Sequence, residues 1–148
     1  MRWVFAWLPV AVAWTAFGCD FEPDVGPAQV ERCVNEDSDP DNAVSFVNDI
    51  VPLVMDKCLP CHDPNGSNNT GFQVGGLDLT SYETFTAGGV NGGAKIVIAG
   101  NPCDSVVIQK TSTAPPFGNR MPFDGPPFET AAEAQMVRDW IAEGASPE

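Results

Sequence analysis

A single five-residue motif constrains this chain more than any other feature: Cys58-Leu59-Pro60-Cys61-His62. Two thiols at this spacing can form thioether bonds to the two vinyl groups of one haem, and the histidine beside the second thiol then meets the iron from the same face. His62 is the only histidine in the sequence. The motif therefore predicts one covalently attached haem c, with His62 as an axial iron ligand.

Two other chemistries use similar motifs and remain as alternatives. A thioredoxin-like thiol pair belongs in a βαβ setting, and the sequence pattern shows no such setting. A structural zinc ion takes four ligands, whereas Cys58, Cys61 and His62 supply three, two of them adjacent in sequence. Haem attachment is the interpretation that this pattern favours.

The second axial ligand must come from elsewhere in the chain. Without a second histidine, methionine is the natural candidate. Met1 begins the apolar N-terminal run, and Met55 and Met136 fall at expected core positions of helices. Met121 lies in a proline-rich stretch, where a loop can carry its thioether over the opposite haem face. We predict Met121 as the ligand. The alternative is a packed methionine below a haem whose sixth iron position is open.

The N-terminus carries an export signal. Residues 3–17 are uncharged and mostly apolar. This run is shorter than the roughly 20 residues that span a membrane, and it is typical of a signal peptide. Residues 16–19, Ala-Phe-Gly-Cys, resemble the site at which bacterial lipoproteins are cleaved and lipidated on cysteine. We predict residues 1–18 as the signal peptide and Cys19 as the lipid-bearing residue, giving an exported protein anchored at a membrane. The alternatives are ordinary cleavage near Gly18 and an uncleaved anchor.

The chain is strongly acidic, with 20 acidic and 7 basic residues and a net charge of −13. This charge disfavours nucleic acid as a partner and favours a basic redox protein, met through salt-sensitive steering. Solubility alone is the alternative reason for the acidity. Acids cluster in residues 20–41, where large apolar residues are few. We therefore predict an acidic tether over residues 19–42 and one domain over residues 43–148.

Apolar spacing predicts helices on both sides of the motif. Residues 46–55 follow a helical period that leads into Cys58, with Pro52 in a first turn or at a kink. A short helix or turn is expected over residues 81–86. The last helix is expected to start at a capping box of Thr130 with Glu133 and to end at Gly144. Its expected buried residues are Met136, Val137, Trp140 and Ile141.

The connecting segments are predicted from their turn residues. Residues 63–76 and 87–93 are rich in glycine and polar residues and are expected to be loops. Residues 96–98 form a short apolar run, expected as a strand or an extended segment. Asn101 is expected to cap a helix that begins at Pro102 and continues through Ile108.

Two cysteines remain after the others are assigned. Cys19 is assigned to lipid and Cys58 and Cys61 to haem, so Cys33 and Cys103 are left over. In an oxidising compartment this remainder suggests a disulfide. A bond between Cys33 and Cys103 would close a loop of about 70 residues. In the chain-entropy model, such a bond stabilises the folded state by roughly 4 kcal/mol. The alternative is a pair of free or intermolecular thiols.

The haem would need supporting groups from the chain. Arg120, Lys95 and Trp140 are the candidate donors to its propionates, and each has an alternative place on the surface or in the core. The carbonyls of Pro64, or of Gly75 and Gly76, are candidate acceptors for the second ring nitrogen of His62. The expected haem walls are Leu77, Leu79, Val97, Ile98, Pro122 and Phe123.

Further short motifs accompany the haem-binding motif along the chain. They are Asp49-Ile50-Val51-Pro52-Leu53, Gly76-Leu77-Asp78-Leu79, Gly100-Asn101-Pro102, Arg120-Met121-Pro122 and Trp140-Ile141-Ala142-Glu143-Gly144-Ala145. In this order they resemble class I c-type cytochromes, and more narrowly the planctomycete-type cytochrome c domains that are also common in exported myxobacterial proteins. The resemblance covers roughly residues 44–145.

The resemblance implies an all-α cytochrome c fold whose N- and C-terminal helices pack around one haem. It implies iron ligation by His62 and Met121, and an electron carrier rather than an enzyme. The alternative is a catalytic or sensing haem domain, peroxidase-like or gas-sensing, with an open iron position. Two features depart from the pattern: no fused partner domain is evident, and Cys103 is an addition to it.

Overall fold

The computed structural model describes residues 33–113, 115–123 and 131–148. The chain divides after Glu31, and the unit Arg32–Glu148 contains all of these residues. Every regular element in them is a helix, which confirms the all-α class for the described part of the chain. No helix among these residues is long and apolar enough to cross a membrane. The predictions for residues 1–18, Cys19 and Thr130 fall outside the described residues.

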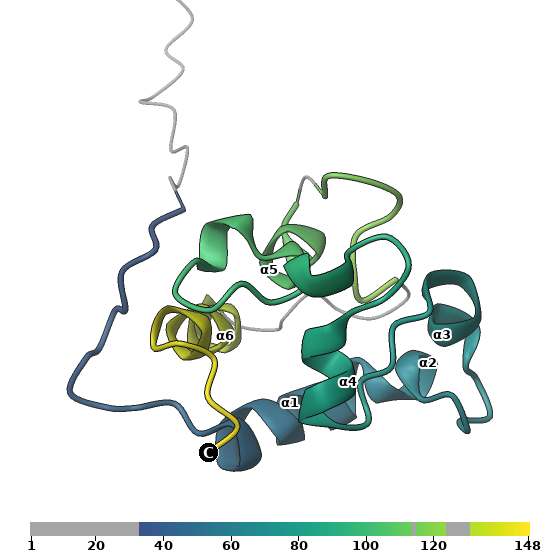
Figure 1. Ribbon diagram of the computed structural model, residues 1–148, viewed down its shortest axis with the longest axis horizontal. Helices are drawn as coiled ribbons and strands as arrows, with labels where there is room; N and C mark the ends of the chain where they lie inside the picture. Colours follow the sequence, from purple (N-terminus) through teal and green to yellow (C-terminus); the bar gives the residue numbers. More distant parts are fainter. Residues whose placement is uncertain (1–32, 114, 124–130) are drawn as a thin grey trace, which may run out of the picture. The chain divides into compact units, whose positions relative to one another are not determined.

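Short helices follow one another along the unit, and only the last exceeds two turns (Figure 1). Their order is η1 Phe46–Ile50, α1 Val51–Lys57, α2 Leu59–His62, α3 Thr70–Gly75, α4 Tyr82–Ala87, η2 Gly93–Lys95, η3 Pro102–Asp104, α5 Val106–Thr111 and α6 Ala131–Ala142. Here η1 is a π-helical turn, and η2 and η3 are 3₁₀ turns.

The first predicted helix forms as η1 followed directly by α1. Ser45 caps its start by accepting a hydrogen bond from the Asn48 backbone N–H at 3.2 Å. Pro52 lies in the first turn of α1, the part of a helix in which proline is best tolerated. The expected position of Pro52 is therefore confirmed. The expected burial of Met55 is wrong, because its side chain is 58 % exposed.

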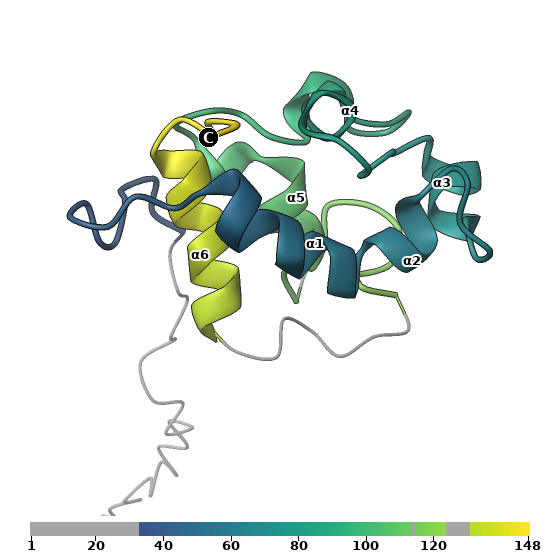
Figure 2. The same cartoon turned by 90° about the horizontal axis from the view of Figure 1, so that it is seen from below.

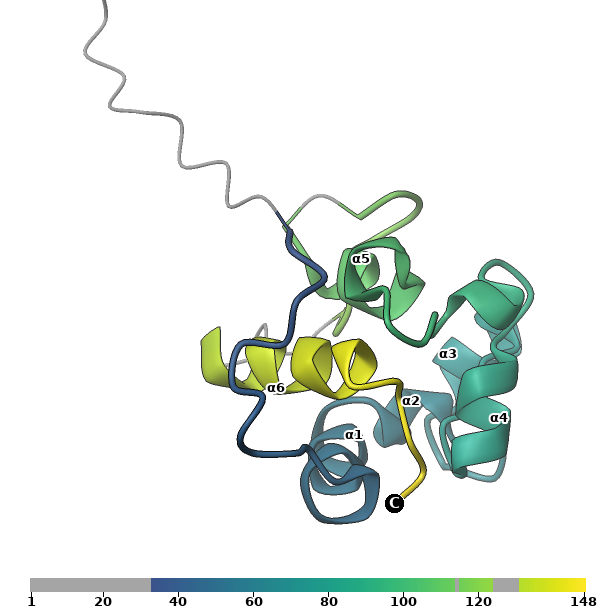
Figure 3. The same cartoon turned by 60° about the vertical axis from the view of Figure 1, so that its left-hand side comes forward.

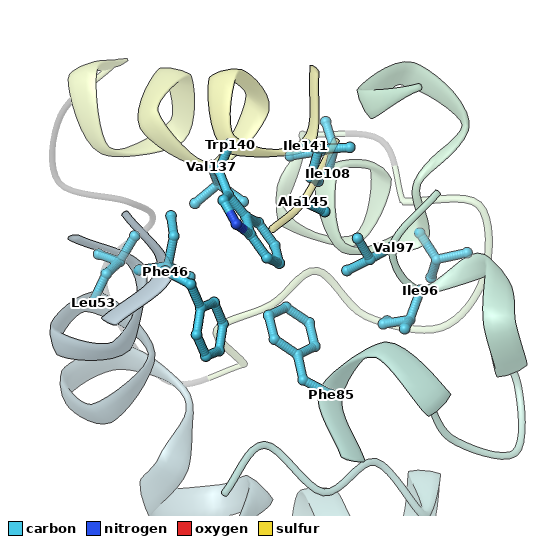
Figure 4. Close-up of a cluster of buried hydrophobic side chains, with 12 residues drawn as sticks. Phe46, Leu53, Phe85, Ile96, Val97, Ile108, Val137, Trp140, Ile141 and Ala145 are labelled. Atoms are coloured by element: carbon cyan, nitrogen blue, oxygen red, sulfur yellow. The ribbon is translucent and has the colours of Figure 1, made fainter. Parts of the chain in front are cut away.

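An aromatic cluster joins η1, α4 and α6 at the centre of the core (Figure 4). The Trp140 ring lies between Phe46 and Phe85, with centroid distances of 5.3 and 5.9 Å. Tyr82 meets Phe46 edge-on at 5.2 Å. The first and last helices therefore contact each other, as Figure 2 also shows. Burial of such rings is a large part of what stabilises a domain of this size.

The C-terminal residues are held against the same cluster. The Phe46 N–H donates to the Glu148 carbonyl at 3.0 Å, and the Tyr82 hydroxyl donates to the Ala145 carbonyl at 2.8 Å. Trp140 is fully buried, and its Nε1–H donates to the Ser146 carbonyl at 2.8 Å. These bonds fix the chain end beside the start of η1.

Three connecting segments differ from their predicted form. The expected loop 63–76 contains α3. The helix expected from Pro102 is interrupted at Ser105, which separates η3 from α5. Ile96 and Val97 are buried but form no strand. Ser105 Oγ accepts from the Ile98 N–H at 2.8 Å, and the Ile96 carbonyl accepts from Val107 at 3.1 Å, so this backbone is satisfied without a partner strand.

The described part of the predicted tether packs on the domain (Figure 3). Cys33 and Cys103 form a disulfide, and Asn35 Oδ1 accepts from the Cys103 N–H at 3.0 Å. Ser38 donates its N–H and its hydroxyl to the two carboxylate oxygens of Asp139, at 2.9 and 2.7 Å. Ordered contacts therefore begin upstream of the expected boundary at residue 43.

Candidate functional site

The five residues of the cysteine motif form one tight turn. Cys58 ends α1 and immediately precedes α2, which carries Cys61 and His62. The backbone N–H groups of Cys61 and His62 both donate to the Cys58 carbonyl, each at 3.1 Å. The two thiols and the imidazole are therefore mounted on a single hydrogen-bonded turn that fixes their relative positions.

A backbone carbonyl orients the His62 ring. Nδ1 lies 3.1 Å from the Leu77 carbonyl oxygen. Since a carbonyl can only accept, Nδ1 carries the proton and Nε2 keeps a free lone pair. The expected acceptors Pro64, Gly75 and Gly76 are therefore wrong.

The charge state of His62 also suits a metal ligand. Burial lowers the pKa of the imidazole, and the hydrogen bond to Leu77 opposes this effect only in part. The ring is consequently neutral at physiological pH, which is the form that binds a metal ion.

The backbone of Gly71 lies beside the Nε2 edge of the ring, where only a residue without a side chain fits. A Cβ at this position would lie 2.7 Å from Nε2 and 2.8 Å from Cε1 of His62, and 2.9 Å from the Cys61 carbonyl oxygen. Any side chain there would displace the imidazole. Sequence reasoning missed Gly71, because it stands in a glycine-rich stretch with no feature that sets it apart.

The two motif cysteines are free thiols, in contrast to the disulfide-bonded pair Cys33 and Cys103. Burial, with contributions from Cys61 and Asp56, raises the pKa of the Cys58 thiol to about 11. Thiol–disulfide exchange requires a thiolate, so a raised pKa disfavours the redox-pair interpretation. Thioether attachment leaves no charge to bury at this position.

Cys58 lines an apolar pocket. Helices η1, α1, α4, α5 and α6 supply most of the other wall residues. The full set is Ile50, Leu53, Val54, Leu77, Leu79, Phe85, Val107, Thr111 and Val137. Thr111 is the single hydroxyl among them, and it donates to the Val107 and Ile108 carbonyls at 2.9 and 3.1 Å. The cavity measures about 50 Å³, and neither Cys61 nor His62 lines it, so it offers an apolar wall beside the Cys58 thiol and not a space for a whole haem.

Only two of the six residues predicted to wall the haem line this pocket. Leu77 and Leu79 line it as expected. Val97 is buried in the core, while Phe123 is 62 % exposed. Ile98 and Pro122 are partly buried and also lie outside the lining of this pocket.

Met121 is half-buried in the segment 115–123. Its backbone N–H donates to the Lys110 carbonyl at 2.8 Å, so its loop is attached to α5. Val107 and Thr111 of the same helix line the pocket, although Met121 does not. Ligation of iron by Met121 stays a prediction.

The three propionate candidates have different surroundings. Arg120 is half-buried and directly precedes Met121, and Lys95 is exposed at the end of η2. Trp140 requires a correction, since its only donor already binds the Ser146 carbonyl inside the core. Its role is packing, and Arg120 and Lys95 remain candidates.

The donor set on these residues fits a covalently attached haem: two free thiols, one neutral imidazole whose Nε2 carries a lone pair, and an apolar wall. Within the described ranges, no three histidine, cysteine, aspartate or glutamate side chains gather as a metal-binding group.

No protein-family model matches the sequence, and comparisons with curated proteins and with solved structures found no match.

Proposed function

We propose that this chain is an exported one-electron carrier of the class I cytochrome c type, with one haem c and no chemically altered substrate. The observation that carries the proposal is the turn Cys58–His62, in which both thiols are free and the imidazole nitrogen Nε2 is left as a lone-pair donor. The apolar pocket at Cys58 supports it further.

Each residue has a defined role in this proposal. Cys58 and Cys61 would hold the haem through thioether bonds, and His62 and Met121 would bind its iron. When bound, the haem supplies the one-electron chemistry. The Leu77 carbonyl fixes the imidazole and increases its basicity. A thioether ligand and an apolar wall that excludes water both favour ferrous iron, so they raise the reduction potential of the haem.

The proposal extends to location and partners. Cleavage before Cys19 and lipidation of that cysteine would anchor the protein at the periplasmic or outer face of a membrane. The net charge of −13 suits a redox protein with a basic docking patch and argues against nucleic acid.

A second candidate function is a catalytic or sensing haem with an open iron position. It is favoured by one observation, that Met121 is not among the residues lining the pocket at Cys58. An open position binds carbon monoxide readily in the ferrous protein, whereas a methionine-ligated iron resists it.

The test is intact-mass spectrometry of the full chain, expressed with the c-type cytochrome maturation machinery. We expect the mass of the polypeptide plus one haem. The variant C58S/C61S should lose the covalent haem, while the matched control C33S/C103S should keep it. A wild-type protein without haem, or a C58S/C61S variant that retains covalent haem, would contradict the proposal. In the loaded protein, a far-red sulfur-to-iron absorption band without carbon monoxide binding would decide against the second candidate.

A further inference from the structure

Lys110 stands out among the described basic residues because of its surroundings. It is the second-last residue of α5, next to Thr111 in the pocket wall. Its carbonyl accepts the Met121 N–H at 2.8 Å. The segment 115–121 is a loop with the predicted ligand Met121 at its end, and this end is thus bonded to α5.

The side chain of Lys110 also contacts this loop. Nζ donates to the Phe117 carbonyl at 2.7 Å and to the Asn119 carbonyl. It also lies 4.7 Å from the centroid of the Phe117 ring, a cation–π distance. A Cβ at Gly118 would have Lys110 Nζ as its nearest neighbour, at 3.7 Å. The ammonium group therefore contacts Phe117 and Asn119, the residues on either side of Gly118.

These contacts supply hydrogen-bond donors, which are few in the sequence of the loop itself. Proline-rich segments supply few backbone donors, so their carbonyls need partners from elsewhere. An ammonium group has three donors and can satisfy two carbonyls at once. Desolvation by the loop lowers the pKa of Lys110 from its ordinary value, which fits an ammonium group taken partly out of water.

We propose that Lys110 is a positioning residue: it holds the loop of residues 115–121 against the end of α5, and so determines whether Met121 stays on the haem iron. This inference rests on the proposed function, since it assigns the control of Met121 ligation. Lys110 itself touches neither the iron nor the haem in this argument. It acts through the Phe117 and Asn119 carbonyls and the Met121 backbone.

The experiment compares the wild-type holoprotein with K110M and K110R. Methionine keeps the length and apolar stem of lysine but donates no hydrogen bond, whereas arginine keeps the charge and the donors. We expect K110M to raise the fraction of ferrous protein that binds carbon monoxide by about tenfold or more, because hydrogen bonds to a charged group are lost. It should also weaken the far-red sulfur-to-iron band, and K110R should retain that band.

A second readout does not depend on the haem spectrum. Hydrogen exchange of the Met121 amide should speed up in K110M. The backbone carbonyl that this amide binds is kept, but the Nζ bonds to the Phe117 and Asn119 carbonyls, which hold the loop in place, are lost. The amide of Cys58, bonded to Val54 in α1, should exchange as in the wild type. Should K110M not fold, F117L removes only the aromatic face and is expected to show the same changes at smaller size.

The possible outcomes separate the two proposals. A wild-type holoprotein with the sulfur-to-iron band, together with K110M that has the same band, the same carbon monoxide binding and the same Met121 exchange, would overturn the role of Lys110 alone. A wild-type holoprotein with covalent haem but no such band would overturn both Met121 ligation and the role of Lys110. Changes in K110M that K110R rescues would support the inference.

Discussion

The imidazole of His62 is held from two directions. The Leu77 carbonyl fixes Nδ1 at 3.1 Å, and the bare backbone of Gly71 lies beside Nε2 and Cε1. A ligand held in this way loses little rotational freedom when it binds a metal, because the ring is already oriented. The Leu77 carbonyl and the Gly71 backbone restrict the ring, and backbone atoms cannot move aside as flexible side chains do.

Gly71→Ala should therefore disturb the site. The added Cβ would fall 2.7 Å from His62 Nε2, so either the ring or α3 must shift. We expect a loss of stability of about 1–3 kcal/mol, as for other overpacked positions, and a lower yield of haem-loaded protein. Urea unfolding and the ratio of haem to protein measure the two effects.

Gly75→Ala is the matched control, because it lies in the same helix and its Cβ would meet nothing within 4 Å. It should be neutral, or stabilising by about 0.4–1 kcal/mol through the unfolded state. Equal behaviour of the two variants would show that the close approach at Gly71 has no consequence.

The sequence identifies the atoms that can react but not the backbone that orients them. Cys58, Cys61 and His62 follow from a local spacing rule. The acceptor for His62 depends on the path of the chain after α3, where Gly76 adopts φ +61° and turns the backbone. Which carbonyl then faces the ring is a tertiary property, and the prediction missed it by one residue.

At the level of elements, the segment after Cys33 and helix α6 are joined by a buried carboxylate. Asp139 is 7 % exposed and accepts from the Ser38 N–H, the Ser38 hydroxyl and Gln135 Nε2. Burial by itself would raise the pKa of Asp139. The hydrogen bonds from Ser38 and Gln135, and the nearby Arg138 charge, outweigh burial and leave the pKa below its ordinary value.

A lowered pKa means that the charged carboxylate stabilises the folded state. Its contribution is complete above the ordinary aspartate pKa of about 3.9 and is lost as the pH falls through the lower folded-state pKa. Asp139→Asn replaces an acceptor by a donor facing Ser38, and should cost about 1–3 kcal/mol near neutral pH. The stability difference from the wild type should shrink below a pH of about 4.

Urea unfolding at neutral and at acidic pH checks this prediction. Asp41→Asn is the control, because Asp41 is an exposed acid in the same segment. It removes the same charge without removing the contacts to Ser38. A stability loss in the Asp139 variant that persists unchanged at low pH would show that shape, and not the carboxylate charge, joins the segment to α6.

The elements illustrate where local patterns stop being informative. Pro52 and the first and last helices follow from proline position and apolar period, and all three were predicted. Met55 fits the same period but is exposed, because periodicity does not say how wide the covered face of a helix is. Ser38 and Asp139 are 101 residues apart, so nothing in the acidic segment itself reveals their contact.

For the molecule as a whole, charge is the property most relevant to the proposed exchange of electrons. The net charge is −13, and no lysine or arginine occurs between Lys57 and Lys95. That interval contains the predicted haem-binding motif and the acids Asp63, Asp78 and Glu83. A partner approaching this part of the chain therefore meets an acidic field, which speeds the encounter with cations and slows it with anions.

The rate of oxidation of the ferrous protein should depend on salt in opposite ways for two small oxidants. With a cationic cobalt(III) complex, the second-order rate constant should fall, by about tenfold, between ionic strengths of about 0.01 M and 0.15 M. Over this range the Debye length shortens from about 30 Å to about 8 Å. With hexacyanoferrate(III), an anion, the rate constant should rise. Stopped-flow absorption at the haem bands measures both reactions. Salt slopes of the same sign for the two oxidants would show that the acidic surface does not steer electron transfer at this site.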